Sequence, residues 1–123
     1  MSENPKRVAL FEDYEGIITS LKMLLPPEGY EIVSITKDMI EAMKIASQLN
    51  KLDVLVALVD GNLTKGERGN WEGALITGTI HEKSPGVVVV GYPSDGIVSG
   101  ADYNVEKSEG PRALLEVLAQ INR

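Results

Sequence analysis

A run of six apolar residues, from Val54 to Val59, constrains the fold of this chain more than any other stretch. The run contains three β-branched valines, has the length of one strand, and shows no alternation with polar residues. Such a strand is typical of the middle of a parallel sheet, where both of its faces are covered. The run ends on a carboxylate, Asp60, and ligands of open α/β sheets bind beyond the carboxyl ends of the strands. Asp60 is therefore the first candidate for a functional residue.

The rest of the chain alternates between strand-like and helix-like segments. Further strands are expected at 8–11, 31–35, 87–90 and 102–106. Helices are expected at 17–25, 39–49, 71–83 and 111–121. Three glycines and a proline between positions 91 and 100 leave room for only a shortened fourth helix. This alternation predicts an α/β fold with a doubly wound, five-stranded parallel sheet, formed by one domain over residues 1–123.

Composition excludes several classes of protein. The 123 residues contain no cysteine, which rules out disulfides and thiolate metal sites and favours a cytoplasmic location. Eighteen acidic against twelve basic residues give a net charge of −6, which argues against direct binding of nucleic acid or an anionic membrane. No apolar run approaches the ~20 residues of a membrane span, and the first strand begins too early for a signal peptide.

Charged side chains follow three of the predicted strands. Glu12 and Asp13 come after the first strand, Asp60 after the third, and Lys107 after the last. Since crossovers between parallel strands are right-handed, these strand ends should meet at one edge of the sheet. Three clustered carboxylates raise each other's pKa unless a cation intervenes, and Mg²⁺ accepts carboxylate and phosphate oxygens together. An aspartate in this position, opposite a lysine, can act as a nucleophile and form an acyl phosphate.

In this order and on this strand pattern, these residues resemble the receiver domains of bacterial two-component response regulators, and the resemblance covers essentially the whole chain. It extends to Asn62 and Leu63 after the central aspartate, to Glu72-Gly73 at the next helix, and to Gly100-Ala101-Asp102 ahead of the lysine. The resemblance implies the flavodoxin-like, receiver-type (CheY-like) form of the predicted sheet. It also implies a role in phosphorelay signalling rather than an enzyme with a substrate of its own.

The resemblance also implies individual roles. Glu12, Asp13, Asp60 and the backbone carbonyl of Asn62 would hold Mg²⁺. Asp60 would accept a phosphoryl group from a sensor histidine kinase or a phosphotransfer protein, and Lys107 would contact that group. The signal would pass to a downstream protein that the sequence does not identify.

Several positions depart from the family pattern. Gly91 stands where the family has a Ser or Thr whose hydroxyl moves onto the phosphate, and Tyr92 follows where a small residue is usual. Asn104 stands in the place of the switch aromatic residue, and Ser108 in the place of a proline. Tyr92 could narrow access to the acceptor, and Ser94 is a candidate to replace the missing hydroxyl. The loop after the third strand is longer than usual.

Two other interpretations stay open at this point. The same fold can serve as a pseudo-receiver, a protein-interaction module without a phosphate cycle, and the departures above favour it. The segment 60–64 is also similar to the nucleophile motif of haloacid-dehalogenase-type phosphatases, but Asn62 stands where that motif needs an aspartate as general acid. Glu67 and Arg68, in the long loop, lie close enough to Asp60 in sequence to fold over its pocket.

Overall fold

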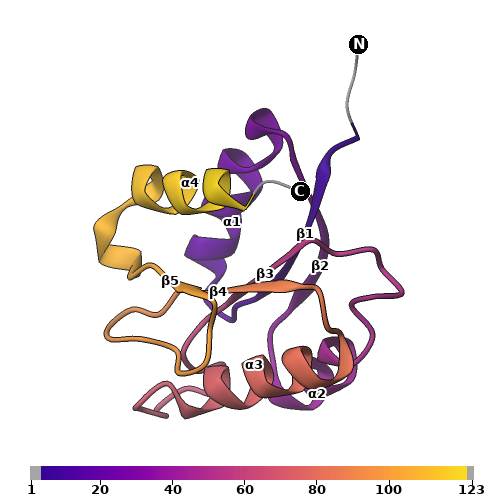
Figure 1. The fold of residues 1–123 in the computed structure, drawn as a ribbon. Coiled ribbons are helices and arrows are strands. Elements are labelled where there is room, and N and C mark those ends of the chain that lie inside the picture. Colours follow the sequence, from indigo (N-terminus) through magenta and orange to yellow (C-terminus); the bar gives the residue numbers. More distant parts are fainter. Residues whose placement is uncertain (1–3, 122–123) are drawn as a thin grey trace.

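Five parallel strands form the centre of the computed structural model, which describes residues 4–121 (Figure 1). The strand order is β2-β1-β3-β4-β5, which confirms the expected doubly wound sheet. The strands are β1 (Lys6–Phe11), β2 (Tyr30–Thr36), β3 (Val56–Val59), β4 (Val88–Gly91) and β5 (Tyr103–Asn104). In the register of the sheet, Phe11 lies beside Val59, and Val59 lies beside Gly91. The residues that follow β1, β3 and β4 therefore emerge at the same edge.

Two pairs of helices cover the two faces of this sheet (Figure 1). The helices are α1 (Glu15–Leu24), α2 (Met39–Ala46), α3 (Trp71–Lys83) and α4 (Pro111–Gln120), with short 3₁₀ turns at Pro26–Glu28 and Lys107–Glu109. The apolar sides of α1 and α4 pack on one face, and those of α2 and α3 pack on the other. As expected, Asp38 caps α2 by accepting a hydrogen bond from the backbone N–H of Glu41.

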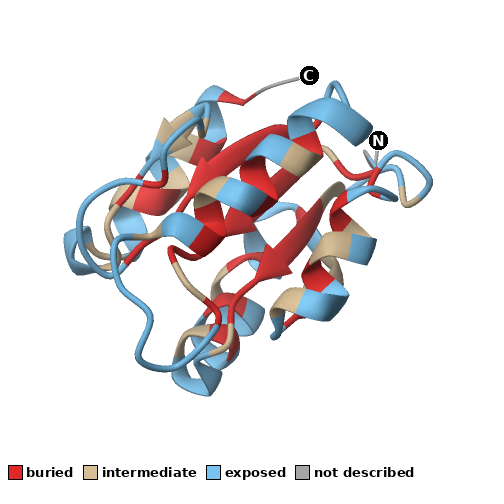
Figure 2. Cartoon of the chain, turned by 90° about the horizontal axis from the view of Figure 1, so that it is seen from below, coloured by how far each residue is buried: buried red, intermediate tan, exposed pale blue. Residues whose placement is uncertain are grey.

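The central strand β3 is buried on both faces, as its sequence predicts (Figure 2). Successive side chains of β3 point to opposite faces of the sheet and pack into the hydrophobic core on each face. Val56 and Leu58 belong to the core under α1 and α4, whereas Ala57 and Val59 belong to the core under α2 and α3. A continuous apolar run was needed because neither face of this strand reaches water.

The connection between β4 and β5 differs from the usual crossover. We expected a shortened helix here, and the structure goes further, because residues 92–102 form only turns and bends. Gly96 and Gly100 both adopt positive φ angles, of 76° and 85°, which a right-handed helix does not accommodate.

Within the described part of the chain, none of the helices is long and apolar enough to pass through a lipid bilayer.

Gly73, in the first turn of α3, allows this helix to start directly against the end of β3. Its N–H donates a hydrogen bond of 2.7 Å to the carbonyl oxygen of Gly61. A Cβ atom at position 73 would lie 2.4 Å from the carbonyl oxygen of Asp60, which is closer than side chains approach. The glycine therefore sets how closely α3 and the loop before it pack around Asp60.

We predict that Gly73→Ala lowers the free energy of unfolding by about 2 kcal/mol, because the added methyl group overpacks against the backbone of Asp60. Gly78→Ala is the matched control in the same helix, since nothing lies within 4 Å of its Cβ position. There the better helix propensity of alanine should stabilise the protein by about 0.5–1 kcal/mol. Urea unfolding of both variants measures the difference, and equal effects would contradict this account.

Candidate functional site

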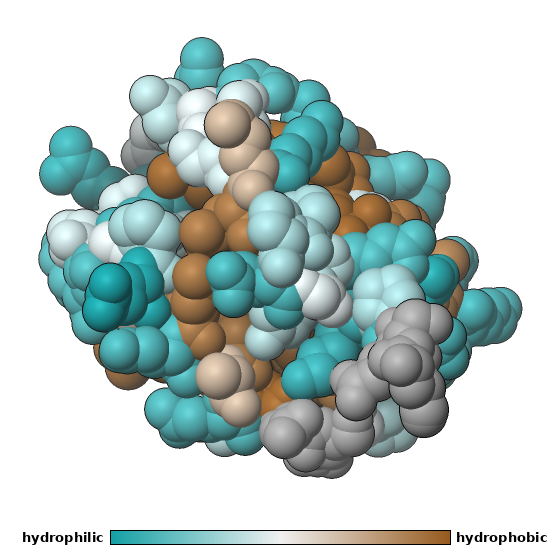
Figure 3. Space-filling model, turned by 90° about the horizontal axis from the view of Figure 1, so that it is seen from above, coloured by the Kyte–Doolittle hydropathy of each residue, from teal (hydrophilic) through white to brown (hydrophobic). Residues whose placement is uncertain are grey.

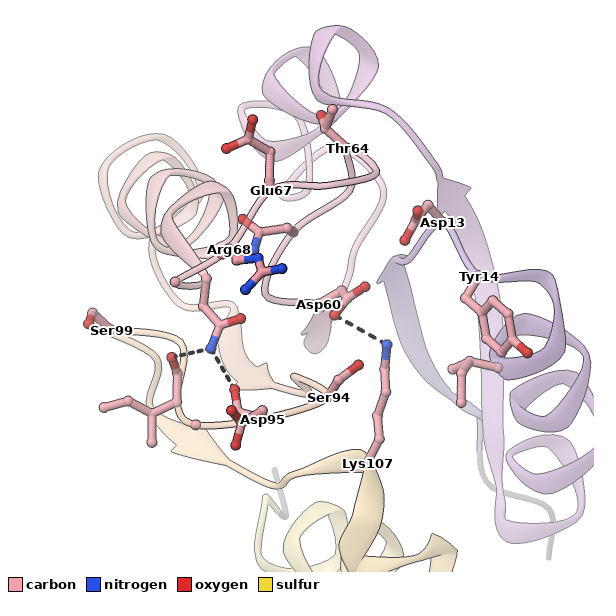
Figure 4. Close-up of a pocket in the computed structure, with 16 residues that line it drawn as sticks. Asp13, Tyr14, Asp60, Thr64, Glu67, Arg68, Ser94, Asp95, Ser99 and Lys107 are labelled. Carbon is pink, nitrogen blue, oxygen red and sulfur yellow. Dashed lines mark hydrogen bonds and ion pairs between the residues drawn. The ribbon is translucent and has the colours of Figure 1, made fainter.

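Lys107 joins the ends of two strands at the carboxyl edge of the sheet. Its Nζ atom lies 3.0 Å from Oε2 of Glu12 and 3.2 Å from Oδ1 of Asp60 (Figure 4 shows the second contact). The backbone N–H of Lys107 donates to the carbonyl oxygen of Pro93, which fixes the residue beyond β5 against the loop after β4. Residues from three distant parts of the sequence therefore form one site, as the strand pattern predicted.

The three predicted carboxylates also meet here. Glu12, Asp13 and Asp60 each offer a carboxylate oxygen, and these oxygens lie within 4.8 Å of one another. Glu12 and Asp60 are buried, with 3% and 7% of their surfaces exposed, and Asp13 is half-buried. Asn62 lines the same cavity, and its side-chain oxygen accepts a hydrogen bond from the backbone N–H of Glu72. This acidic cluster could hold a metal ion.

The electrostatics of the cluster fit a cation. Burial, followed by the negative charge of Asp60, raises the pKa of Glu12 to about 8, although Lys107 opposes this shift. Burial and Asp60 also raise the pKa of Asp13. Burial lowers the pKa of Lys107, but the two neighbouring carboxylates outweigh it and raise that pKa overall. One lysine therefore does not offset three carboxylates, and a divalent ion would relieve the remaining repulsion.

Glu72, a buried carboxylate on α3, holds the loop that follows Asp60. Its Oε1 accepts hydrogen bonds from the backbone N–H groups of Leu63, at 2.7 Å, and Thr64, at 2.9 Å. Its Oε2 accepts from the hydroxyl of Thr64. The sequence indicated Glu72 only through the family resemblance. The local signal for its contact with the loop is an acidic residue in the first turn of a helix, directly after a polar loop.

The structure leaves no room for a side chain at position 91, because the side chains of Asn104 and Val98 fill the space beside Gly91. Gly91 lies beside Asn104 in the pairing of β4 and β5. A Cβ atom at position 91 would meet Oδ1 of Asn104 at 2.3 Å and Cβ of Val98 at 2.7 Å. Asn104 also bonds the backbone of Val98 twice, as an acceptor from its N–H and as a donor to its carbonyl oxygen. The departures at positions 91 and 104 are therefore parts of one structural feature.

Tyr92 does not narrow access to Asp60, contrary to the expectation. It is 6% exposed and belongs to the core under α1 and α4, and this burial raises the pKa of its hydroxyl. Its side chain packs with the residues of that core and does not line the cavity above Asp60. Ser94, the candidate for the missing hydroxyl, does line the cavity beside Lys107 (Figure 4).

A cavity of about 980 Å³ opens above Asp60, and both Glu67 and Arg68 line it. Asn70 also lines the cavity, and its Nδ2 atom donates to the carbonyl oxygens of Asp95, at 2.7 Å, and Ile97, at 3.0 Å (dashed lines in Figure 4). The lengthened loop after β3 is thus tied to the loop after β4. His81 lies outside this site and pairs with Asp102 at 3.1 Å.

No family model matches this chain, and no curated protein matches it in sequence. Solved structures do match it. The receiver domain of a CheY-like response regulator from Methanospirillum hungatei JF-1 is 25% identical, with a TM-score of 0.72 over 94% of this chain and 92% of that chain. The chain has the fold of response-regulator receiver domains. The agreement in fold confirms the expected CheY-like architecture.

Two further receiver structures are similar at lower identity. One is the receiver domain of the sensor histidine kinase PA1611 from Pseudomonas aeruginosa PAO1, described with a magnesium ion in its active-site cleft. It is 20% identical, with a TM-score of 0.72 over 94% of this chain and 95% of that receiver. The other is a chain of the CheX–CheY complex with BeF₃ and magnesium from Borrelia burgdorferi. It is 18% identical, with a TM-score of 0.74 over 97% of this chain and 91% of that one.

We predict that Glu72→Ala lowers the free energy of unfolding by about 2–3 kcal/mol, because it leaves the donors of Leu63 and Thr64 without their acceptor. Glu82→Ala, an exposed position on the same helix, is the control and should change stability by less than about 0.5 kcal/mol. Chemical denaturation gives both values. Faster amide hydrogen exchange at Leu63 and Thr64 in the first variant would confirm that the loss is local.

Proposed function

We propose that this chain is a phospho-accepting receiver domain, in which Asp60 takes a phosphoryl group from a histidine kinase or a phosphotransfer protein. The observation that carries the proposal is the bridge from Lys107 to both Glu12 and Asp60 at the carboxyl edge of the sheet. A lysine placed this way can compensate the charge of a phosphoryl group on the aspartate. The receiver-like fold, which covers 94% of this chain, supports the same function.

The hydrogen bonds of Asp60 leave one oxygen available for the reaction. Oδ1 accepts from the backbone N–H of Gly61, at 2.7 Å, and contacts Lys107. We infer that Oδ2 attacks the phosphorus of a phosphohistidine, so that an O–P bond forms while the N–P bond breaks. The electron pair of the broken bond stays on the imidazole nitrogen, which takes up a proton from solvent. The product is an acyl phosphate on Asp60.

We propose that Glu12, Asp13, Asp60 and the backbone carbonyl of Asn62 hold Mg²⁺. When bound, this ion would neutralise charge on the carboxylates and on the phosphate oxygens. The supporting observation is the crowding of three carboxylates beside a single lysine. Among the chain's own residues, Lys107 holds Asp60 in place and Glu12 positions Lys107.

A phosphorylation-independent interaction module is the second candidate function. The packing around Gly91 favours this second function. The hydroxyl of the usual relay is missing at Gly91, and its aromatic group is missing at Asn104. A groove between α1 and the start of α4 is lined by apolar residues that include Met23, Leu24 and Tyr92. Figure 3, seen from the side of these helices, shows hydrophobic side chains reaching a surface that is otherwise largely hydrophilic.

We predict that Mg²⁺ raises the thermal unfolding temperature of this protein, since a ligand that binds only the folded state stabilises it. At about ten times the dissociation constant the gain is about 1.4 kcal/mol. Asp13→Asn should lose most of this gain, and Glu116→Gln, an exposed position on α4, should keep it. A protein whose unfolding ignores Mg²⁺ would contradict the metal site and favour the interaction module.

We predict that incubation with acetyl phosphate and Mg²⁺ adds one phosphoryl group to the intact protein, as measured by mass spectrometry. Asp60→Asn should show no gain, because an amide oxygen does not form a stable acyl phosphate in this way. Asp95→Asn is the control, since this carboxylate lines the same cavity without belonging to the cluster. Absence of the gain in the unmodified protein, with Mg²⁺ bound, would overturn the proposed phosphate chemistry.

A further inference from the structure

The site lacks one contact that a phosphoryl group on Asp60 would need. A hydroxyl at position 91 is excluded, because Asn104 and Val98 occupy the space of its side chain. The remaining cation at the floor of the site, Lys107, is already shared between Glu12 and Asp60. A phosphorylated aspartate adds about 1.5–2 negative charges and three acceptor oxygens. These oxygens require another donor from the walls of the cavity.

Arg68 is the second cation of this cavity. Among the described residues that line it, only Lys107 and Arg68 are basic. Figure 4 shows the guanidinium group of Arg68 directed into the cavity, on the opposite side of Asp60 from Lys107. Arg68 is exposed and makes no hydrogen bond or ion pair with any residue between positions 4 and 121. Its charge is therefore available to an anion bound above Asp60.

The loop around Arg68 is anchored on both sides, and glycines flank Arg68 between the anchors. On one side, Thr64 is held by Glu72. On the other side, Asn70 is held by the carbonyl groups of the loop after β4. Gly66 and Gly69, which flank Arg68 between these anchors, have φ angles of 88° and 82°. Such glycines let a short segment reorient at low cost.

The neighbouring acid does not compete for the guanidinium. Glu67 accepts a hydrogen bond of 2.6 Å from Nε1 of Trp71, and no ion pair joins it to Arg68 in the described structure. Trp71 is the only tryptophan of the chain, and it is half-exposed next to this loop. Its fluorescence should therefore report a movement of the segment that carries Arg68.

We propose that Arg68 binds the phosphoryl group on Asp60 and takes over the contact that a hydroxyl at position 91 cannot make. The inference rests on the proposed phosphate chemistry of Asp60. A guanidinium group donates two parallel hydrogen bonds to a phosphate, and such charge-assisted bonds are stronger than those of a hydroxyl. The signal then leaves the site through residues 64–70 and, by way of Asn70, through residues 95–97.

The test uses beryllofluoride, which binds to an aspartate carboxylate as an acyl phosphate analogue, at saturating Mg²⁺. We expect Arg68→Ala to raise the half-saturating beryllofluoride concentration about tenfold, measured by ¹⁹F NMR and by Trp71 fluorescence. Arg68→Lys should recover part of this loss, because lysine keeps the charge but not the two parallel donors. Lys65→Ala is the matched control, since it removes the same charge from the same loop outside the cavity.

The affinity for Mg²⁺ separates a direct contact from a structural role. Removal of a positive charge near three carboxylates should leave this affinity unchanged or raise it. If Arg68→Ala weakens Mg²⁺ and beryllofluoride binding equally, the residue only supports the loop, and the proposal is overturned. It is also overturned if Ser94→Ala loses beryllofluoride affinity while Arg68→Ala does not.

The phosphorylation assay separates a failure of Asp60 phosphorylation from a failure of the proposed Arg68 contact. If acetyl phosphate adds no mass to the unmodified protein, the proposed function fails, and the role of Arg68 fails with it. If the mass gain occurs and Arg68→Ala binds beryllofluoride as tightly as the unmodified protein, only the role of Arg68 fails.

Discussion

The buried contact of Lys107 with Glu12 and Asp60 is the interaction on which the site depends. It connects the segments after β1, β3 and β5, which are far apart in the sequence and adjacent only at the carboxyl edge of the sheet. Loss of one partner of a buried ion pair costs about 3–5 kcal/mol, because the other charge stays desolvated. The site therefore requires the lysine and both carboxylates together. This explains why their order along the strand pattern was more informative than any single residue.

The unusual features of this receiver fold compensate one another. The absence of a helix between β4 and β5 leaves a loop that needs other support, and three side chains supply it. Asn104 bonds Val98, Asn70 bonds the carbonyl groups of Asp95 and Ile97, and Glu106 accepts from the N–H of Gly96. Gly61 makes room for the Asn70 side chain in this position, since a Cβ atom at position 61 would lie 1.8 Å from Oδ1 of Asn70.

This compensation changes how the site can respond to a ligand. In the family pattern, a hydroxyl after the fourth strand moves onto the phosphate, and an aromatic switch residue precedes the lysine. Here, the Asn104 side chain fills the space beside Gly91 and is hydrogen-bonded to the backbone of Val98, which leaves no such movement available. The loop between Thr64 and Asn70 is instead exposed, rich in glycine, and in contact with both the cavity and the loop after β4. This loop is therefore the route along which the proposed response to phosphate would pass.

Much of the fold and of the site was predictable from local sequence. The apolar run before Asp60 predicted a central parallel strand because both of its faces are buried, and the residues after the strands predicted the carboxylate and lysine cluster. Tyr92 was misjudged, because a single sequence does not show on which face of the sheet a residue beyond a strand end will lie. The hydrogen bonds of Glu72 to the loop were also missed, because they depend on the close approach of α3 to β3 that Gly73 permits.

The sequence by itself determined the order of strands and helices, the charges at the strand ends, and the absence of a hydroxyl at position 91. These properties follow from hydrophobic periodicity and from the identity of residues, which are local. Only the tertiary structure decided that Asn104 fills the space at Gly91 and that Asn70 ties two loops together. The position of Arg68 at the cavity above Asp60 was suggested by its place in the long loop and is confirmed by the structure. Contacts of this kind depend on register and on side-chain packing between distant segments, which no local pattern specifies.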